Sequence, residues 1–317
     1  MGISVIIPAY NAGRLIDEAI ESVLRQQTPA DEIIVINDGS TDRDYSILEK
    51  RHHSIRVINQ PNRGVSAARN VGCEMATHDY IAVLDADDFW LPGKLHEQMR
   101  PFTQNPNVDA VFCLGRQWTP WQNAPPPLAS ESAAQEASPP EVRRLYYSDF
   151  LCSFAVYPST MVVKRSAWRS IGGYDEDRRY GEDWDFYLRL SHGHQIVLVD
   201  RIAMLYRKHT ASATASIQHK NHWADVLNNA TRTLGLTDKF GNQVNHAKFK
   251  QHLFMIHFMH GYEHFWSGNF QVAQQQFARA AKMRPLAPRA IAYLALSYSP
   301  CLRNLVQISR PLIQRHQ

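Results

Sequence analysis

The sequence has 317 residues, of which 44% are apolar and 20% are charged. These values are ordinary for a globular protein with a sizeable core, and they exclude disorder over the whole length. The net charge of +4 is unevenly spread, because residues 1–219 carry −5 and residues 220–317 carry +9. We therefore expect a main domain followed by a basic appendage with a different partner.

The cysteines and the N-terminus bear on the cellular compartment. The four cysteines, at positions 73, 113, 152 and 301, form no CxxC pair. Their spacing argues against a disulfide framework or a structural zinc site and favours a reducing compartment. The first residues lack the basic region of a signal peptide, and no apolar run approaches the roughly 18–20 residues of a membrane-spanning helix. We therefore expect a cytoplasmic protein, either soluble or peripheral at the inner face of the membrane.

Short β-branched runs alternate with amphipathic segments in the first part of the sequence. The runs predict buried strands at 3–8, 33–37, 55–59 and 80–84. The segments between them predict helices at 15–24, 42–51 and 65–77. This alternation is typical of a mainly parallel central sheet flanked by helices, so the sequence predicts an α/β fold.

The later part of the sequence is less regular. Further strands are predicted at 108–114, 160–163, 196–199 and 202–207. Helices are predicted from Pro92, at 166–171 and at 182–192, and the sequence from 220 onward is predicted to be helical throughout. A stretch rich in Pro, Ala and Ser at 119–141 predicts a flexible loop or lid, or else an insertion without a role. We place an α/β domain at 1–218 and a basic helical region at 219–317.

Polar residues gather where each of the first four predicted strands ends. The four groups are Pro8-Ala9-Tyr10-Asn11, Asn37-Asp38-Gly39-Ser40, Asn62-Arg63-Gly64 with Arg69, and Asp85-Ala86-Asp87-Asp88. In open α/β sheets, ligands bind beyond the carboxyl ends of the strands, so the four groups should converge. An aromatic ring at Tyr10 suits a base, and guanidinium groups suit phosphate oxygens. Together these groups predict a site for a nucleotide diphosphate.

Three carboxylates lie within four residues at 85–88. Without a cation they would repel one another, and Mg²⁺ and Mn²⁺ bind carboxylate and phosphate oxygens. An acidic turn or a helix cap would have the same local composition. The position directly after a buried strand, beside the other three groups, favours a metal site.

Two further groups of chemical interest lie in the second half. Glu182 and Asp183 begin a predicted helix, where the helix dipole lowers the pKa of a carboxylate. Such a pair is either a cap or a source of a general base for an attacking hydroxyl. His209 follows Arg207 and Lys208 at the end of a predicted strand, and this group could meet a diphosphate or a metal. A single histidine is more often structural.

Taken in order, these segments resemble the inverting glycosyltransferase family 2, which has the GT-A fold. The matching segments are VIIPAYN at 5–11, DEIIV at 31–35, NDGSTD at 37–42, NRGVSAARN at 62–70, LDADD at 84–88 and GEDWD at 181–185. No single segment is decisive, but all of them in this order are specific. The resemblance covers about residues 3–212.

The resemblance implies a role for each matching residue. The residues that it implies in donor nucleotide binding are Pro8, Tyr10, Asn11, Asp38, Arg63, Arg69 and Asp85. Pro8 and Tyr10 would lie against the base of the nucleotide, and Asp38 would recognise that base by a hydrogen bond.

The remaining roles concern the metal and the acceptor. The resemblance implies that Asp87 and His209 bind Mg²⁺ or Mn²⁺ and that Asp183 is the catalytic base. Glu182 and Trp184 would belong to the acceptor site.

The resemblance also implies an activity. The expected reaction is hexosyl or N-acetylhexosaminyl transfer from a UDP-sugar to a hydroxyl of a glycan or glycolipid, in the assembly of a bacterial-type surface polysaccharide, lipopolysaccharide or glycolipid. Two alternatives stay open. One is a sugar nucleotidyltransferase, although the loop at 8–13 lacks the glycine-rich character of that class. The other is a scaffold without activity, although the acidic residues of the motifs are intact.

The basic tail carries a weaker resemblance. Residues 261–285 are similar to one tetratricopeptide unit, a helix pair with small residues where its helices touch. One such unit cannot bury its face alone, so it should pack on the main domain or on a partner. Residues 303–315 predict either an amphipathic helix on anionic lipid or an ordinary packed helix. The tail has no nucleic-acid motif, so a membrane surface or a protein is the expected partner.

Overall fold

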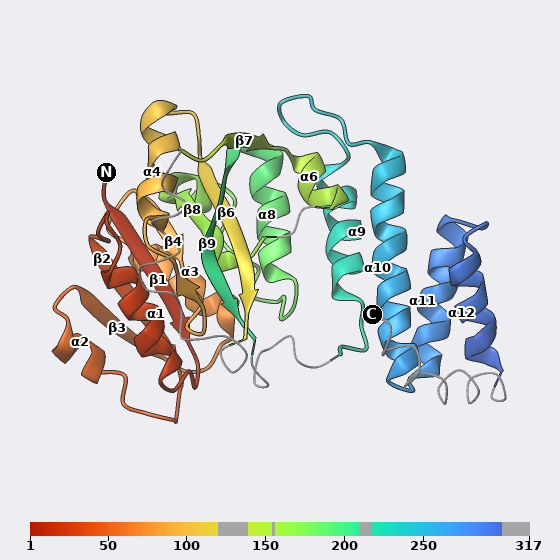
Figure 1. Ribbon diagram of the computed structural model, residues 1–317, viewed down its shortest axis with the longest axis horizontal. Coiled ribbons are helices and arrows are strands. Elements are labelled where there is room, and N and C mark those ends of the chain that lie inside the picture. Colours follow the sequence, from red (N-terminus) through yellow and green to blue (C-terminus); the bar gives the residue numbers. More distant parts are fainter. Residues whose placement is uncertain (120–138, 154–155, 209–216, 300–317) are drawn as a thin grey trace. The chain divides into compact units, whose positions relative to one another are not determined.

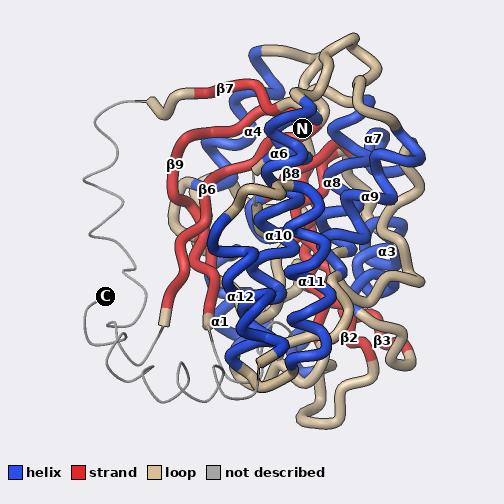
Figure 2. Tube along the Cα trace, turned by 90° about the vertical axis from the view of Figure 1, so that its right-hand side faces the viewer, coloured by secondary structure: helices blue, strands red, loops and turns tan. Residues whose placement is uncertain are grey.

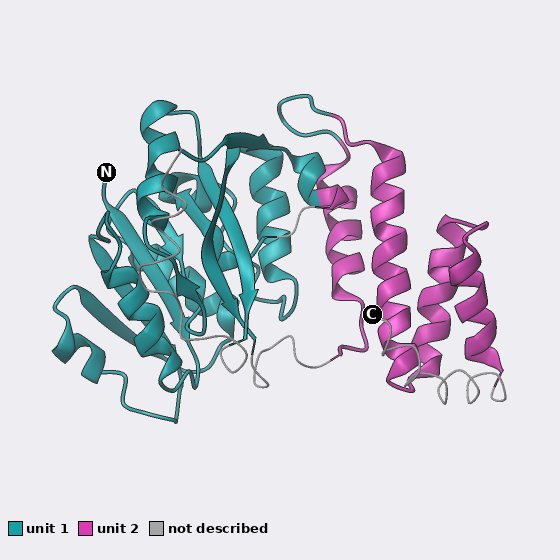
Figure 3. Cartoon of the chain, viewed as in Figure 1, with its two compact units in different colours: residues 1–150, 154–212, 237–242 teal, residues 151–153, 213–236, 243–317 magenta. Residues whose placement is uncertain are grey.

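The computed structural model describes residues 1–119, 139–153, 156–208 and 217–299 (Figure 1). The chain divides into two compact units (Figure 3). Unit 1 comprises residues 1–150, 154–212 and 237–242, and unit 2 comprises residues 151–153, 213–236 and 243–317. The predicted features at 120–138, at His209 and at 303–315 lie outside the described residues.

Within the described residues, unit 1 is built on a mixed nine-stranded sheet. The strands are β1 (Ile3–Ala9), β2 (Glu32–Asp38), β3 (Ile55–Gln60), β4 (Tyr80–Val83), β5 (Phe89–Trp90), β6 (Ala110–Trp118), β7 (Val142–Leu145), β8 (Met161–Lys164) and β9 (Ile196–Arg207). Their order is β3-β2-β1-β4-β8-β6-β9-β5, with β7 paired to β9. Strands β1 to β4 are mutually parallel, β6 is parallel to β9, and β8, β5 and β7 run antiparallel to their neighbours.

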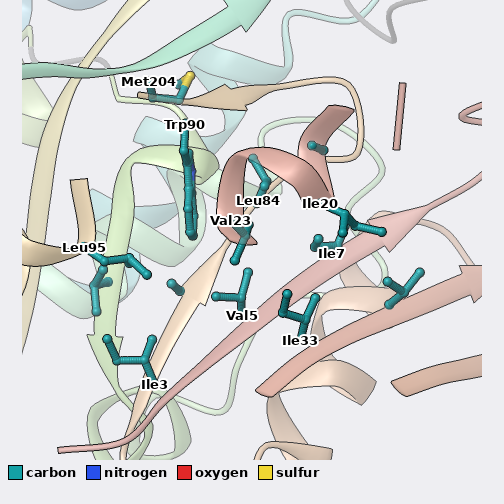
Figure 4. Packing of buried hydrophobic residues seen from close by; sticks show 14 of the residues in the cluster. Ile3, Val5, Ile7, Ile20, Val23, Ile33, Leu84, Trp90, Leu95 and Met204 are labelled. Carbon is teal, nitrogen blue, oxygen red and sulfur yellow. The ribbon is translucent and has the colours of Figure 1, made fainter. Parts of the chain in front are cut away.

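Helices cover both faces of this sheet. They are α1 (Leu15–Leu24), α2 (Ile47–Arg51), α3 (Val65–Met75), α4 (Lys94–Gln104), α6 (Tyr147–Cys152), α7 (Arg165–Ser170) and α8 (Glu182–Gly193). Because side chains alternate along a strand, Val5 and Ile7 of β1 pack with Ile20 and Val23 of α1 on one face (Figure 4). The predicted α/β fold with a helix-flanked central sheet is confirmed, and the sheet is mixed rather than mainly parallel.

Several predicted elements have different limits in the structure. Helix α2 begins at Ile47 instead of residue 42, because Asp44 accepts hydrogen bonds from both the N–H and the hydroxyl of Ser46 in a turn. Strand β9 is one strand over 196–207, because β6 pairs along it on both sides of a register shift. Strand β5 was not predicted, since two residues are too few to show a periodicity.

A lysine is buried in the core of unit 1. Lys94, at the start of α4, has 0% exposure, and its Nζ lies 3.9 Å from the centre of the Trp90 ring. Within the described residues this Nζ has no hydrogen-bond partner. Burial lowers the pKa of Lys94 to about 8. The ammonium group therefore destabilises the folded state at neutral pH, and the aromatic ring offsets only part of that cost.

We predict that Lys94→Met raises the free energy of unfolding at pH 7 by about 1–3 kcal/mol, because it removes an unpaired buried charge while keeping the side-chain volume. The unfolded chain binds the proton more tightly than the folded chain, so wild-type stability should rise between about pH 8 and pH 10.4. The variant should lack this rise. Urea unfolding across that range, with exposed Lys50→Met as the control, tests both statements. Equal or lower stability of Lys94→Met at pH 7 would contradict them.

Unit 2 is a set of helices. They are α9 (His222–Leu234), α10 (His246–Trp266), α11 (Phe270–Met283) and α12 (Pro288–Tyr298). Residues 235–245 form turns, so the prediction of helix throughout this region was wrong there. Helices α10 and α11 pack against each other, as Figure 2 shows, and a Cβ added at Gly261 would lie 3.0 Å from the Phe277 ring. No helix in the described residues combines the length and the apolar character needed to cross a bilayer.

Candidate active site

The loops after β1, β2 and β3 are tied together at one edge of the sheet. Asn11, with a φ of 48°, donates its N–H to Ser40 Oγ (3.0 Å), and its Oδ1 accepts the Thr41 N–H (2.8 Å). Gly39 has a φ of 76°, and a Cβ there would lie 2.8 Å from the backbone nitrogen of Asn62. A residue with a side chain would therefore separate these loops. The loops after the parallel strands β1, β2 and β3 therefore lie together at one edge of the sheet, as predicted.

Asp38 is buried at the end of β2 and organises the next loop. Its Oδ1 accepts hydrogen bonds from Gln60 Nε2 (2.7 Å) and from the Arg63 N–H (2.9 Å). Its Oδ2 accepts the N–H of Gly64 (2.9 Å), the residue that precedes α3. Oδ2 keeps capacity for a further donor, since each carboxylate oxygen can accept two hydrogen bonds. Asp38 thus combines a structural contact with one remaining position for a ligand.

The other residues predicted to contact a base differ in exposure. Pro8 is buried within β1, whereas the Tyr10 side chain is 56% exposed at the edge of the sheet. The guanidinium of Arg63 is on the surface and donates to Glu176 Oε2 (2.7 Å). An exposed ion pair of this kind contributes little energy, so Arg63 can exchange Glu176 for another anion.

Arg69, on α3, joins two motifs that lie far apart in the sequence. Its Nη2 donates to Asp85 Oδ1 (2.8 Å) and its Nη1 donates to Glu182 Oε1 (3.0 Å). Its side chain is 3% exposed, and its Cζ lies 5.3 Å from the centre of the Tyr174 ring. Burial acts to lower the pKa of Arg69, but Asp85 and Glu182 outweigh it and hold the pKa well above its ordinary value. Arg69 is therefore charged and binds both acids in one buried cluster.

The acidic turn after β4 is held by Ser159 and Arg207, and sequence analysis did not assign Ser159 to the site. Asp88 is 1% exposed, accepts the hydroxyl of Ser159 (2.6 Å) and accepts the Arg207 N–H (3.2 Å). Ser159 Oγ in turn accepts the N–H of Asp85 (3.0 Å). Burial, and then the charges of Asp87 and Asp85, raise the pKa of Asp88 well above its ordinary value. No local pattern in the sequence points to Ser159.

Arg207, the last residue of β9, supports the same turn. Its Nε donates to the carbonyl oxygen of Asp87 (2.8 Å), and its Nη2 donates to Glu18 Oε2 (2.5 Å). Its Cζ lies 4.5 Å from the centre of the Trp118 ring. The sequence raised the possibility that Arg207 meets a diphosphate, but its side chain is only 5% exposed. In the structure Arg207 instead fixes the backbone of the turn that carries Asp87.

Asp183 and Glu182 begin α8, after Gly181 at a φ of 73°. Asp183 Oδ1 accepts the N–H of Trp184 (2.8 Å), and the Trp184 side chain is itself buried. Burial of the carboxyl group, followed by repulsion from Glu182, raises the pKa of Asp183 to about 7. The expectation that a helix start lowers this pKa was wrong, because burial outweighs the helix dipole here. A carboxylate with a pKa near 7 can take and release a proton under physiological conditions.

The acidic turn is the predicted metal site. Within the described residues no three His, Cys, Asp or Glu side chains are arranged to hold a metal ion. Asp85 and Asp87 are partly exposed, while Asp88 is buried. A Mg²⁺ ion usually takes one or two carboxylates and completes its shell with phosphate oxygens and water. The residues present therefore fit a hard divalent ion that is shared with a bound diphosphate. His209 lies outside the described residues.

The sequence matches a known protein family over about half of its length. The family model of "Glycosyl transferase family 2" matches residues 4–170. The chain belongs to glycosyl transferase family 2. The match includes the strand-end loops, Arg69, the acidic turn and Ser159.

Relatives of this family 2 chain include a glycosyltransferase and a hyaluronan synthase. It is 31% identical over 218 residues to the uncharacterized glycosyltransferase EpsJ of Bacillus subtilis, a match that covers 67% of this chain and 62% of EpsJ. It is 26% identical over 241 residues to the hyaluronan synthase of Pasteurella multocida, which covers 74% of this chain and 24% of that enzyme. The chain therefore spans less than two thirds of the length of either relative.

Solved structures show the same fold. The chain is similar to the structure of S. aureus TarS 1–349 in complex with UDP-GlcNAc, with a TM-score of 0.64 and 19% identity over 98% of this chain and 92% of that one. The complex of TarS 1–349 with UDP gives a TM-score of 0.58 at 18% identity, over 100% of this chain and 93% of that one. This similarity supports a GT-A-type glycosyltransferase fold with a helical C-terminal region.

Proposed function

We propose that this chain is an inverting glycosyltransferase that moves a sugar from a UDP-sugar to a hydroxyl group of a growing glycan or glycolipid. The single observation that carries the proposal is the Arg69 bridge. It brings the acidic turn at Asp85 and the helix start at Glu182, which are separated by 97 positions in the sequence, into one buried cluster. This bridge supports the proposal that the donor site and the candidate base act within one site.

The strand-end loops supply the residues for the donor. The exposed ring of Tyr10 can cover the base, and the remaining position on Asp38 Oδ2 can accept an N–H from it. The TarS complex with UDP-GlcNAc supports a UDP-sugar as the donor class. The relative named hyaluronan synthase supports a polysaccharide as the product class.

A divalent cation is part of this proposal. Asp87 would hold Mg²⁺ or Mn²⁺, with Asp85 beside it and His209 as a further candidate ligand. When bound, such an ion supplies positive charge that stabilises the departing diphosphate. The protein's own contribution is to hold the turn in place, since Ser159 binds Asp85 and Asp88 and Arg207 binds the carbonyl oxygen of Asp87.

Asp183 performs the proton transfer in this proposal. Its carboxylate takes the proton of the acceptor hydroxyl while that oxygen attacks the anomeric carbon from the face opposite the diphosphate. One bond forms to the acceptor oxygen and the bond to the diphosphate oxygen breaks, so a single displacement inverts the configuration. Glu182 stays paired with Arg69 and contributes to the raised pKa of Asp183.

A thermal-shift measurement with UDP and Mn²⁺ tests the donor half of the proposal. At ligand concentrations about 100 times the dissociation constant, binding adds about 2.7 kcal/mol, which raises the melting temperature by roughly 5 °C in a protein of this size. Asp87→Asn should lose the metal-dependent part of the shift. Exposed Asp200→Asn, on β9, is the matched control and should keep it.

The outcomes of this measurement separate two claims. No stabilisation by UDP with either metal would overturn the UDP-sugar donor. Full stabilisation by UDP without metal would overturn the proposed role of the cation and would leave the UDP-sugar donor in place. For the transfer itself, product analysis with a panel of UDP-sugars should show a single inverted anomeric configuration, and a retained configuration would contradict the single displacement.

A further inference from the structure

The turn between α11 and α12 exposes a leucine on a well-defined backbone. Leu286 is 93% exposed. The turn is closed by a hydrogen bond from the Ala287 N–H to the Arg284 carbonyl (3.0 Å), and Ala287 packs against the cluster around Phe254. Prolines at 285 and 288 restrict the backbone on either side of Leu286. The leucine is therefore presented at a fixed point, although exposing it to water is unfavourable.

Exposed cations lie at the same end of unit 2 as this leucine. Phe254 of α10 packs against Ala280 of α11, and His257 binds Gln276 (2.7 Å), so the two helices run antiparallel. The first turns of α10 consequently lie at the same end of unit 2 as the α11–α12 turn (Figure 1). The exposed cations at this end include Lys250, Lys282, Arg284 and Arg289.

Within the described helices α10 to α12, no carboxylate lies near those charges. From residue 243 to residue 317 the sequence contains one acidic residue, Glu263. Glu263 lies 13 positions after Lys250 on α10, which corresponds to roughly 20 Å along the helix axis. The charge at the turn end of unit 2 is therefore of one sign over the described helices α10 to α12.

We propose that this end of unit 2 docks on an anionic phospholipid surface. We call it the basic tip and define it as Lys250, Lys282, Arg284, Leu286 and Arg289. The cations attract anionic headgroups, and the leucine enters the boundary between headgroups and acyl chains. A nucleic acid or a soluble polyanion would use the cations but would gain nothing from an exposed leucine. The combination favours a membrane surface, and it is independent of the sugar-transfer proposal.

Co-sedimentation of the whole chain with vesicles tests this proposal. Phosphatidylcholine vesicles with about 30% phosphatidylglycerol should bind the chain at low salt, and pure phosphatidylcholine should bind it weakly. Leu286→Ser should lower the partition coefficient about tenfold. Lys282→Gln and Arg289→Gln should each lower it about fivefold, and the loss should grow when the two are combined.

Two control variants match these changes in chemistry but lie at the start of α9, away from the basic tip. Trp223→Ser removes an exposed apolar side chain, and Lys220→Gln removes an exposed cation. Both should bind vesicles as the wild type does. Wild-type binding by the tip variants, or no binding of the wild type to anionic vesicles, would overturn the proposal. A loss in the charge variants together with full binding of Leu286→Ser would also overturn it, and would indicate a surface for soluble polyanions.

Discussion

Asp183→Asn should reduce sugar transfer by about 10³-fold while leaving UDP binding close to that of the wild type. An amide cannot accept the proton of the attacking hydroxyl, but it keeps the shape of the carboxyl group. The measurement is initial-rate transfer together with a UDP thermal shift on the same preparation. Wild-type activity of Asp183→Asn would remove Asp183 as the base.

A loss of folding can be separated from a loss of chemistry. The ionised Asp183 is disfavoured in the folded protein, because its pKa is raised from 3.8 to about 7. The folded state binds the proton more tightly than the unfolded state, so this group makes stability fall as pH rises through that window. At pH 8 the Asn variant should consequently be at least as stable as the wild type. Asp185→Asn is the contrasting control, since it removes the negative charge that pairs with Arg189 Nε (2.8 Å) and should lose stability rather than chemistry.

The same carboxylate predicts a pH profile. The base must be deprotonated, so kcat/KM should fall about tenfold per pH unit below the pKa of Asp183, which is about 7. Above that pH the profile should level off. Glu182→Gln removes the second-largest cause of the raised pKa, so its acid limb should move to lower pH. An unmoved limb would indicate that another group controls the profile.

Arg69→Met should destabilise the fold by about 3–5 kcal/mol, because it leaves Asp85 and Glu182 without their shared cation. The same change should abolish activity in whatever fraction folds. Urea unfolding measures the first effect. The matched control is Arg165→Met, since Arg165 donates to the Ala76 carbonyl (2.6 Å) with no carboxylate involved, and its cost should be about 1 kcal/mol.

A double variant tests whether the loss of the Arg69 bridge causes the loss of stability. If the cost of Arg69→Met comes from unpaired acids, Arg69→Met combined with Glu182→Gln should recover part of the lost stability. Arg69→Lys should keep the charge but cannot reach both acids in the same geometry, so it should bind UDP less well than the wild type. If the losses of stability of the two single variants simply add in the double variant, Arg69 and Glu182 do not stabilise each other and the bridge is contradicted.

Local patterns in the sequence were enough to predict the fold class and the main motifs. The β-branched runs around Val5 and Ile34 predicted strands, because burial on both faces of a parallel sheet demands apolar residues at successive positions. Chain order then placed Tyr10, Asp38 and Asp87 after strands, at the edge where ligands bind in such sheets. These features depend only on neighbours in sequence, and they sufficed to recognise the family.

The tertiary structure alone decided how the charged groups pair. Arg69 meets Glu182 across 113 positions, Ser159 meets Asp88 across 71 and Arg207 meets Glu18 across 189. It also decided the pKa of Asp183, which a helix start by itself would have shifted the other way. The reason is that desolvation and charge partners depend on which distant segments surround a group, and no local pattern records that. The sequence therefore determines which chemical groups are present, and the fold determines what each group can do.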